Sequence, residues 1–264
     1  MHKPLRITAL AAAVVVAGAG LYGAGAATAG QSTANSTHEP YNIGLLVKDI
    51  DTYYGTALDA DGVYQASPDS QYAKDLARID ASARKYIDQA AHKGHHRGTK
   101  PAVVFDIDDT LLLSLDYEKR YNYTYNSASW AAYVNKADRP AVFGSAELVR
   151  YAESKGVEVF YNSGLGEAQR TAAVENLRKI GADVNLDAGH MFLKDAANPP
   201  SYLSACATPG TWTCTTVQYK SGTRKHIEAL GYDVIANFGD QYSDLDGGYA
   251  DRTYKLPNPT YFVS

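Results

Sequence analysis

Two aspartates at the end of an apolar run are the residues of this chain best suited to chemistry. Asp106 and Asp108 follow the apolar run at 102–105, and Thr110 lies two residues further on. Because side chains i and i+2 of a strand point the same way, a buried strand would place both carboxylates side by side. Burying such a pair is costly unless a cation neutralises it or one acid carries a proton. The pattern favours a reactive site over a structural one.

The surrounding sequence predicts the elements that position this pair. From residue 102 onward, apolar strands alternate with amphipathic helices. We expect strands at 102–107, 157–161, 190–193, 233–238 and 252–255, and helices at 127–136, 145–155, 167–180 and 223–230. Gly156, Gly181 and Gly231 stand at the helix–strand junctions, where a helix commonly ends. The alternation predicts an α/β fold with a parallel sheet and helices on both faces.

Other polar residues follow or adjoin the predicted strands. Ser163-Gly164 ends the second strand, Lys220 precedes a helix, and Asp240 and Asp244 follow the strand at 233–238. In parallel α/β sheets, ligands bind at the carboxyl ends of the strands. We therefore expect these side chains to lie near Asp106 and Asp108.

The first residues predict export. A basic start with Lys3 and Arg6 precedes an apolar stretch to Ala27, and Ala27-Thr28-Ala29 is typical of a signal-peptide cleavage site. We predict a signal peptide at 1–29 and a polar linker at 30–40, hence a secreted protein without stable membrane association. A membrane anchor is the alternative. Loss of Lys3 and Arg6 leaves 23 basic against 29 acidic residues, a net charge of −6, so we expect no nucleic-acid partner.

Two cysteines separated by a short turn predict a disulfide in an exported chain. Cys206 and Cys214 flank a Pro-Gly-containing segment, so the bond would close a hairpin. Free thiols or a metal pair are the alternative. Before the first strand, helices at 41–58 and 69–92 predict a helical N-terminal extension over 41–98. We interpret His92, His95 and His96 as a solvated loop rather than a metal site, because no acid or cysteine completes a ligand set.

The motifs in this order resemble those of the haloacid dehalogenase (HAD) superfamily. The matching branch is the subfamily IIIB acid phosphatases, which includes plant vegetative storage proteins and bacterial secreted acid phosphatases. Asp106-Ile107-Asp108-Asp109-Thr110, Ser163, Lys220 and the run Gly239 to Leu245 match the four family motifs. The ending Lys255-Leu256-Pro257-Asn258-Pro259 with Tyr261 is also similar. The resemblance covers about residues 40–264 and implies a Rossmann-like HAD domain at 41–264, with a small cap at 111–145.

The resemblance implies a secreted, Mg²⁺-dependent phosphomonoesterase acting on small phosphate esters. Asp106 would be the nucleophile and Asp108 the general acid and base, a role that separates phosphatases from dehalogenases. Mg²⁺ would bind Asp106, the main-chain carbonyl of Asp108, and Asp240. Ser163, Gly164 and Lys220 would bind phosphate, with Thr110 and Asp244 in support. Arg224 competes with Lys220 as the phosphate-site cation. A catalytically weak storage or binding protein, or a nucleotidase or phosphotransferase, is the alternative, and the sequence leaves the oligomeric state open.

An aromatic segment follows the first motif. Its rings are Tyr117, Tyr121, Tyr123, Tyr125 and Trp130. We hypothesise that some of them line the pocket and stack on aromatic leaving groups or nucleobases. Packing in the core or on the surface is the alternative.

Overall fold

A five-stranded parallel sheet organises the part of the chain from Asn42 to Ser264. The computed structural model describes residues 40–92 and 98–264, so the predicted signal peptide, the predicted linker up to residue 39, His95 and His96 lie outside the described residues. The strands are β3 (Lys100–Phe105), β4 (Glu158–Gly166), β5 (Met191–Lys194), β8 (Tyr232–Gly239) and β9 (Thr253–Lys255). Their order is β5-β4-β3-β8-β9, and every neighbouring pair is parallel. The predicted α/β class is confirmed.

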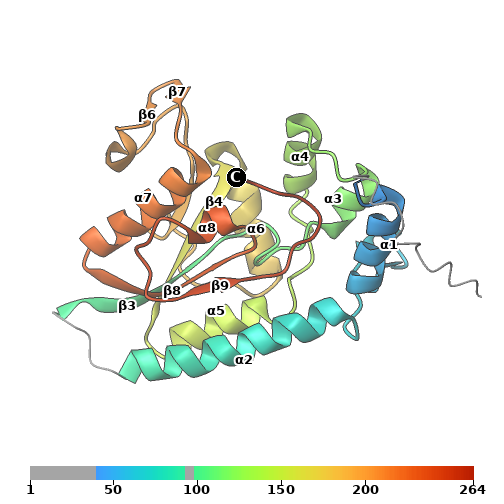
Figure 1. The fold of residues 1–264 in the computed structure, drawn as a ribbon. Helices are drawn as coiled ribbons and strands as arrows, with labels where there is room; N and C mark the ends of the chain where they lie inside the picture. The colour runs from blue at the N-terminus through green and yellow to red at the C-terminus, as the bar shows by residue number, and fades with distance from the viewer. Residues whose placement is uncertain (1–39, 93–97) are drawn as a thin grey trace, which may run out of the picture. The chain divides into compact units, whose positions relative to one another are not determined.

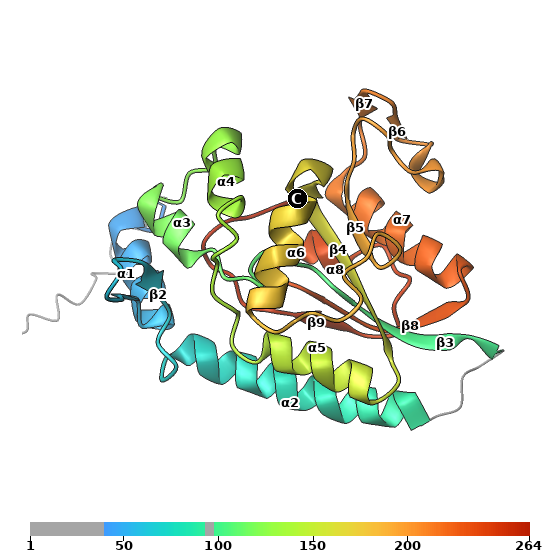
Figure 2. The ribbon, with the colours of Figure 1, turned by 180° about the vertical axis from the view of Figure 1, so that it is seen from behind.

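Helices cover both faces of the sheet (Figures 1 and 2). One face carries α2 (Gln71–His92), α5 (Ser145–Ser154) and α6 (Arg170–Lys179), and the other carries α7 (Thr216–Ala229). Strand β3 shows why two cores form. Val103 and Phe105 join the larger core cluster, whereas Val104 packs in a second cluster with Ile227 of α7. Successive side chains of a strand point to opposite faces, so one apolar strand supplies both layers.

Aromatic rings tie the strands that carry the site. Phe105 of β3 stacks on Phe238 of β8 at 4.5 Å between ring centroids, and Phe238 stacks on Tyr254 of β9 at 4.8 Å. All three rings are buried. Such contacts add about 0.5–1.5 kcal/mol each beyond area burial, so they fix the lateral spacing of three strands just before the carboxyl edge of the sheet.

The N-terminal extension is helical only in part. Helix α1 (Ile43–Tyr54) ends at Gly55, and the strands β1 (Ala57–Leu58) and β2 (Tyr64–Gln65) form an antiparallel hairpin before α2. The predicted helix at 41–58 is therefore wrong beyond Tyr54. Gly55 adopts φ +58°, and a Cβ there would lie 2.8 Å from the Cβ of Ser67. Only glycine allows the chain to turn back at this point.

Two outgrowths rise on opposite sides of the same edge of the sheet, with the C-terminus between them (Figures 1 and 2). One is the segment 111–145 with α3 (Leu115–Arg120) and α4 (Ser127–Val134). The other follows β5 and contains the short helix η3 (Ser201–Leu203) and the hairpin of β6 (Ala207–Thr208) and β7 (Thr211–Trp212). The predicted disulfide Cys206–Cys214 closes this hairpin.

Short helices complete the fold. Helix η2 (Glu167–Gln169) leads into α6, and α8 (Tyr242–Leu245) follows β8 directly. Gly156, Gly181 and Gly231 all have positive φ at the predicted helix–strand junctions, as expected for helix ends. Over residues 40–92 and 98–264, none of the helices has the length and apolar composition needed to span a membrane.

The disulfide should contribute measurably to stability. Replacing both Cys206 and Cys214 with Ser should lower the free energy of unfolding by about 2–3 kcal/mol, because the bond restricts a short loop of the unfolded chain. Urea denaturation measures the loss, and wild type treated with a thiol reductant should lose the same amount. Equal stability of oxidised and reduced wild type would contradict the expectation.

Candidate active site

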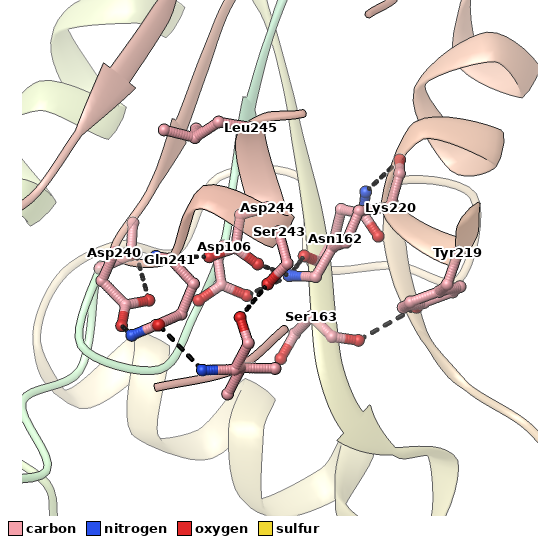
Figure 3. Close-up of polar contacts among 12 residues, drawn as sticks. Asp106, Asn162, Ser163, Tyr219, Lys220, Asp240, Gln241, Ser243, Asp244 and Leu245 are labelled. Atoms are coloured by element: carbon pink, nitrogen blue, oxygen red, sulfur yellow. Dashed lines mark hydrogen bonds and ion pairs between the residues drawn. The ribbon is translucent and has the colours of Figure 1, made fainter. Parts of the chain in front are cut away.

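Lys220 joins the polar side chains at the carboxyl edge of the sheet (Figure 3). Its Nζ donates to Oδ1 of Asp106 at 2.5 Å and to the carbonyl oxygen of Asn162 at 2.5 Å, and it forms an ion pair with Oδ1 of Asp244 at 2.8 Å. The lysine is 2% exposed. The ends of β3 and β4 and the start of α8 therefore converge on one buried ammonium group.

The structure places Arg224 away from this edge. Its guanidinium donates to the main-chain carbonyls of Asp244, Asp246 and Gly248 at 2.5–2.8 Å. Arg224 thus fixes the chain after α8, one turn of α7 beyond Lys220. Of the two candidates for the phosphate-site cation, Lys220 is the one that contacts the carboxylates.

Three buried aspartates lie close enough to share one cation. Asp106, Asp240 and Asp244 each offer a carboxylate oxygen, and these atoms lie within 4.8 Å of one another. Asp240 follows β8, and Asp244 lies in α8. Gly239, the last residue of β8, is obligatory, because a Cβ there would lie 2.4 Å from the Cβ of Asp244. The Gly-Asp pair therefore lets α8 fold back against the end of β8.

Asp240 is oriented by its neighbours. Gln241 Nε2 and Asn258 Nδ2 both donate to its Oδ2 at 2.7 Å, and the Thr110 hydroxyl lies 3.5 Å from its Oδ1. Two amide donors on Oδ2 leave Oδ1 as the oxygen that can bind a ligand. Thr110 therefore lies beside Asp240, and Asn258 belongs to the C-terminal run Lys255 to Pro259, for which the sequence analysis gave no role.

The electrostatics of this cluster favour a bound divalent cation. Burial, opposed by Lys220 and reinforced by Asp244 and Asp240, raises the pKa of Asp106 well above its ordinary value. Burial and the charge of Asp244 likewise raise the pKa of Asp240 to about 7. One ammonium cannot balance three carboxylates, and carboxylate oxygens are the ligands that Mg²⁺ prefers. The donor set therefore fits a hard divalent ion.

Asp108 pairs with a different cation from the one that contacts Asp106 and Asp244. Its Oδ1 accepts a hydrogen bond from Nη1 of Arg139 at 2.6 Å, and the arginine side chain is fully buried. The backbone of Arg139 is held on both sides by Asn176, which accepts from its N–H at 3.0 Å and donates to its carbonyl at 2.8 Å. Asn176 belongs to α6. The guanidinium also lies 5.4 Å from the ring centroid of Trp130.

The second motif sits beside the acids at the end of β4. Ser163 is fully buried, its Oγ accepts from the Leu165 N–H at 3.1 Å, and its carbonyl accepts from the Tyr219 hydroxyl at 3.0 Å. Gly164 lines the cavity described below. Arg170, which follows this motif, pairs with Glu167 and donates to the Met191 carbonyl, so it contributes to the fold of the strand end.

A cavity of about 750 Å³ opens above these residues. Asp106, Asp108, Lys220, Asp240 and Asp244 form its floor. The segment 111–145 lines one side with Glu118, Tyr123, Tyr125 and Trp130, and β5 and the disulfide hairpin line another with Lys194 and Trp212. Three of the five predicted aromatic residues thus reach the cavity. Tyr117 does not, because it is buried against Trp130 at 4.9 Å between ring centroids, and Tyr121 does not line the cavity.

The C-terminal residues also reach the cavity. Residues 261–264 line it, and they are held there by the fourth motif. The Val263 N–H donates to Oε1 of Gln241 at 3.1 Å, and the Ser243 hydroxyl donates to the Val263 carbonyl at 2.8 Å. Sequence reasoning missed this wall and also missed Arg139 and Glu118, because no spacing in the chain marks these residues.

Comparison with known proteins agrees with this geometry. The profile of the HAD superfamily, subfamily IIIB (acid phosphatase), matches residues 59–264. The chain belongs to this subfamily. It is therefore a member of a family of phosphoric monoester hydrolases, as the motifs predicted.

The relatives include proteins named as plant glycoproteins or storage proteins and proteins named as acid phosphatases. The chain is 30% identical to the Stem 28 kDa glycoprotein of Glycine max over 73% of this chain and 70% of that protein. It is 29% identical to Vegetative storage protein 1 of Arabidopsis thaliana, over 73% and 66%. It is 30% identical to Acid phosphatase 1 of Solanum lycopersicum, over 61% and 58%. The class C acid phosphatase from Bacillus anthracis shares the fold, with a TM-score of 0.58 at 22% identity, covering 74% of this chain and 80% of that one.

Glu118 should make the free energy of unfolding of this protein depend on pH. Burial raises the pKa of Glu118 to about 7 from 4.5. The folded chain therefore holds the proton more tightly, and stability falls as pH rises from about 4.5 through 7. Glu118→Gln should be more stable than wild type at pH 8 by up to about 3 kcal/mol, with the difference vanishing near pH 4.

Urea denaturation at several pH values measures this difference. Glu147→Gln is the matched control, because the Glu147 side chain is 59% exposed and should give a flat response. A Glu118→Gln chain that is no more stable than wild type at pH 8 would contradict the assignment.

Proposed function

We propose that this protein is a secreted, Mg²⁺-dependent phosphomonoesterase that works through an aspartyl-phosphate intermediate. The observation that carries the proposal is the buried group of Asp106, Asp240, Asp244 and Lys220 at the floor of an open cavity. This arrangement combines a nucleophile, oxygen ligands for a divalent ion and a cation for the phosphoryl charge.

Asp106 is placed to attack phosphorus. Lys220 binds its Oδ1, so Oδ2 is the oxygen that would form the new bond to phosphorus while the ester P–O bond breaks. Lys220 also offsets the charge shared by the carboxylate and the incoming phosphate. The Ser163 hydroxyl and the main chain at Gly164 would bind phosphoryl oxygens. Asp106 and Asp240 would hold Mg²⁺ with the Asp108 carbonyl, Asp244 acting through water, and the bound ion would neutralise charge on the phosphoryl group.

Asp108 would carry the proton in both half-reactions. In the first it gives a proton to the leaving alkoxide, and in the second it takes one from the water that hydrolyses the aspartyl-phosphate, which releases inorganic phosphate and restores Asp106. Asp108 lines the cavity, and Arg139 binds its Oδ1 at 2.6 Å, so the other carboxylate oxygen would be the one that exchanges the proton. Arg139 is a positioning residue in this mechanism, and Asn176 positions Arg139 in turn.

Secretion is supported by the N-terminal sequence pattern and by the disulfide. The named relatives include plant glycoproteins. Small phosphate esters fit the cavity, whereas the acidic mature chain offers no general attraction for nucleic acid. A storage protein without catalysis is the second candidate, because one relative carries that name.

Hydrolysis of an aryl phosphate separates these candidates. Wild type should be active with Mg²⁺, lose activity with a chelator and regain it when Mg²⁺ is restored. Asp106→Asn should fall below about a thousandth of wild-type kcat, because the nucleophile is lost. Asp183→Asn, a surface substitution, should match wild type. Wild type that is inactive between pH 4 and 8 with Mg²⁺ would favour the storage protein.

The role of Arg139 predicts a dependence on the leaving group. Arg139→Gln should lower kcat/KM for an alkyl phosphate by about 10–100-fold, because the poor leaving group needs a well-placed acid. It should lower kcat/KM for 2,4-dinitrophenyl phosphate far less, since that leaving group departs without a proton and kcat/KM does not include hydrolysis of the shared aspartyl-phosphate.

Two further variants make this test specific. Asn176→Ala should show the same pattern more weakly, and Arg178→Gln, exposed on α6, should match wild type with both substrates. Equal losses on both substrates would mean that Arg139 only supports the fold.

A further inference from the structure

Glu118 is a carboxyl group in the cavity that the mechanism above does not use. It lies on α3, lines the same cavity as Asp106 and Asp108, and is 6% exposed. Among the residues that the structure describes, no side chain or main-chain group donates a hydrogen bond to its carboxylate, and no cation pairs with it. A buried carboxyl group without a partner is costly, so its presence in a binding cavity calls for a ligand that satisfies it.

The basic residues next to Glu118 in sequence and the lysines that line the cavity are engaged elsewhere. Lys119, next in sequence, pairs with Asp51 at 2.6 Å, and Arg120 pairs with Asp116 at 2.8 Å. Lys220 is engaged by Asp106 and Asp244, and Lys194 lies 5.0 Å from the ring centroid of Trp212 on the hairpin side. Of the residues of the segment 111–145 that line the cavity, Glu118 therefore presents a carboxyl group that is paired with no cation of the described chain.

Aromatic residues of the same segment line this side. Tyr123, Tyr125 and Trp130 line the cavity with Glu118, and the Tyr123 N–H donates to the Glu118 carbonyl at 2.8 Å. Ring faces attract cations, and aromatic residues combined with a carboxylate bind ammonium groups well. A neutral hydroxyl would satisfy the carboxyl group but would draw no benefit from the rings, so the combination favours a cation.

We propose that Glu118 and these rings bind an ammonium group on the alcohol part of the substrate. The protein would then prefer phosphate monoesters of amino alcohols over those of neutral alcohols of the same shape. This inference rests on the proposed function, because it assigns the substrate class of the same cavity. Burial raises the pKa of Glu118 to about 7, and a bound cation would favour the ionised form.

A pair of substrates that differ only in charge tests the proposal. Choline phosphate and 3,3-dimethylbutyl phosphate have nearly the same shape, with nitrogen replaced by carbon. The ratio of their kcat/KM values in wild type should be about 10 or more, as a desolvated cation–π and carboxylate site provides. In Glu118→Gln the ratio should fall toward one, and in Glu147→Gln it should equal that of wild type. A wild-type ratio near one, or a ratio that persists in Glu118→Gln, would overturn the proposal.

Binding to a chain without the nucleophile separates this inference from the proposed function. Calorimetric titration of Asp106→Asn, with Mg²⁺ present, should give tighter binding of choline phosphate than of 3,3-dimethylbutyl phosphate. The difference should disappear when Glu118→Gln is added. If wild type hydrolyses no phosphate ester, the proposed function fails, yet this titration still decides whether the ammonium site exists. Equal binding of both compounds to Asp106→Asn would show that it does not.

Discussion

The buried ammonium of Lys220 is the interaction on which the site depends. It contacts Asp106 after β3, the carbonyl of Asn162 in β4 and Asp244 in α8, so three elements close on one charge. Removing that charge would leave buried carboxylates uncompensated, which is far costlier than losing a surface ion pair. In the proposed mechanism, the residue that holds the edge of the sheet together would thus also balance the charge of a phosphoryl group.

Other polar groups near this edge are satisfied without a contact to Lys220. Arg224 lies one turn away, yet main-chain carbonyls after α8 satisfy its guanidinium. Gln241 and Asn258 take up one oxygen of Asp240, so that residue needs no cation to fix its orientation. Main-chain and amide groups therefore satisfy Arg224 and orient Asp240, and the Lys220 ammonium group contacts Asp106, the proposed nucleophile.

The sequence was sufficient to predict the sheet, and which polar residues gather at its carboxyl edge, for a simple reason. In a parallel sheet, strand ends collect at one edge, so Asp106, Ser163 and Asp240 had to meet wherever the strands paired. Arg139 and Glu118 follow no such rule. They come from the segment 111–145, whose path is set by tertiary contacts such as the Leu113 N–H donating to the Pro140 carbonyl. The C-terminal wall was missed for the same reason, because Gln241 and Ser243 hold it only in the folded chain.

The segment 111–145 connects Asp108, the proposed proton carrier, with the part of the cavity that would contact the alcohol part of the substrate. Arg139 lies near the end of the segment and binds Asp108. Glu118 and the aromatic rings lie earlier in the same segment. Trp130 contacts both sets, since it lines the cavity and lies against the Arg139 guanidinium. A leaving group bound to this segment would therefore be held by the same element that orients the acid that protonates it. Selectivity for the alcohol and protonation of its oxygen would then share one rigid support, which is anchored to α6 through Asn176.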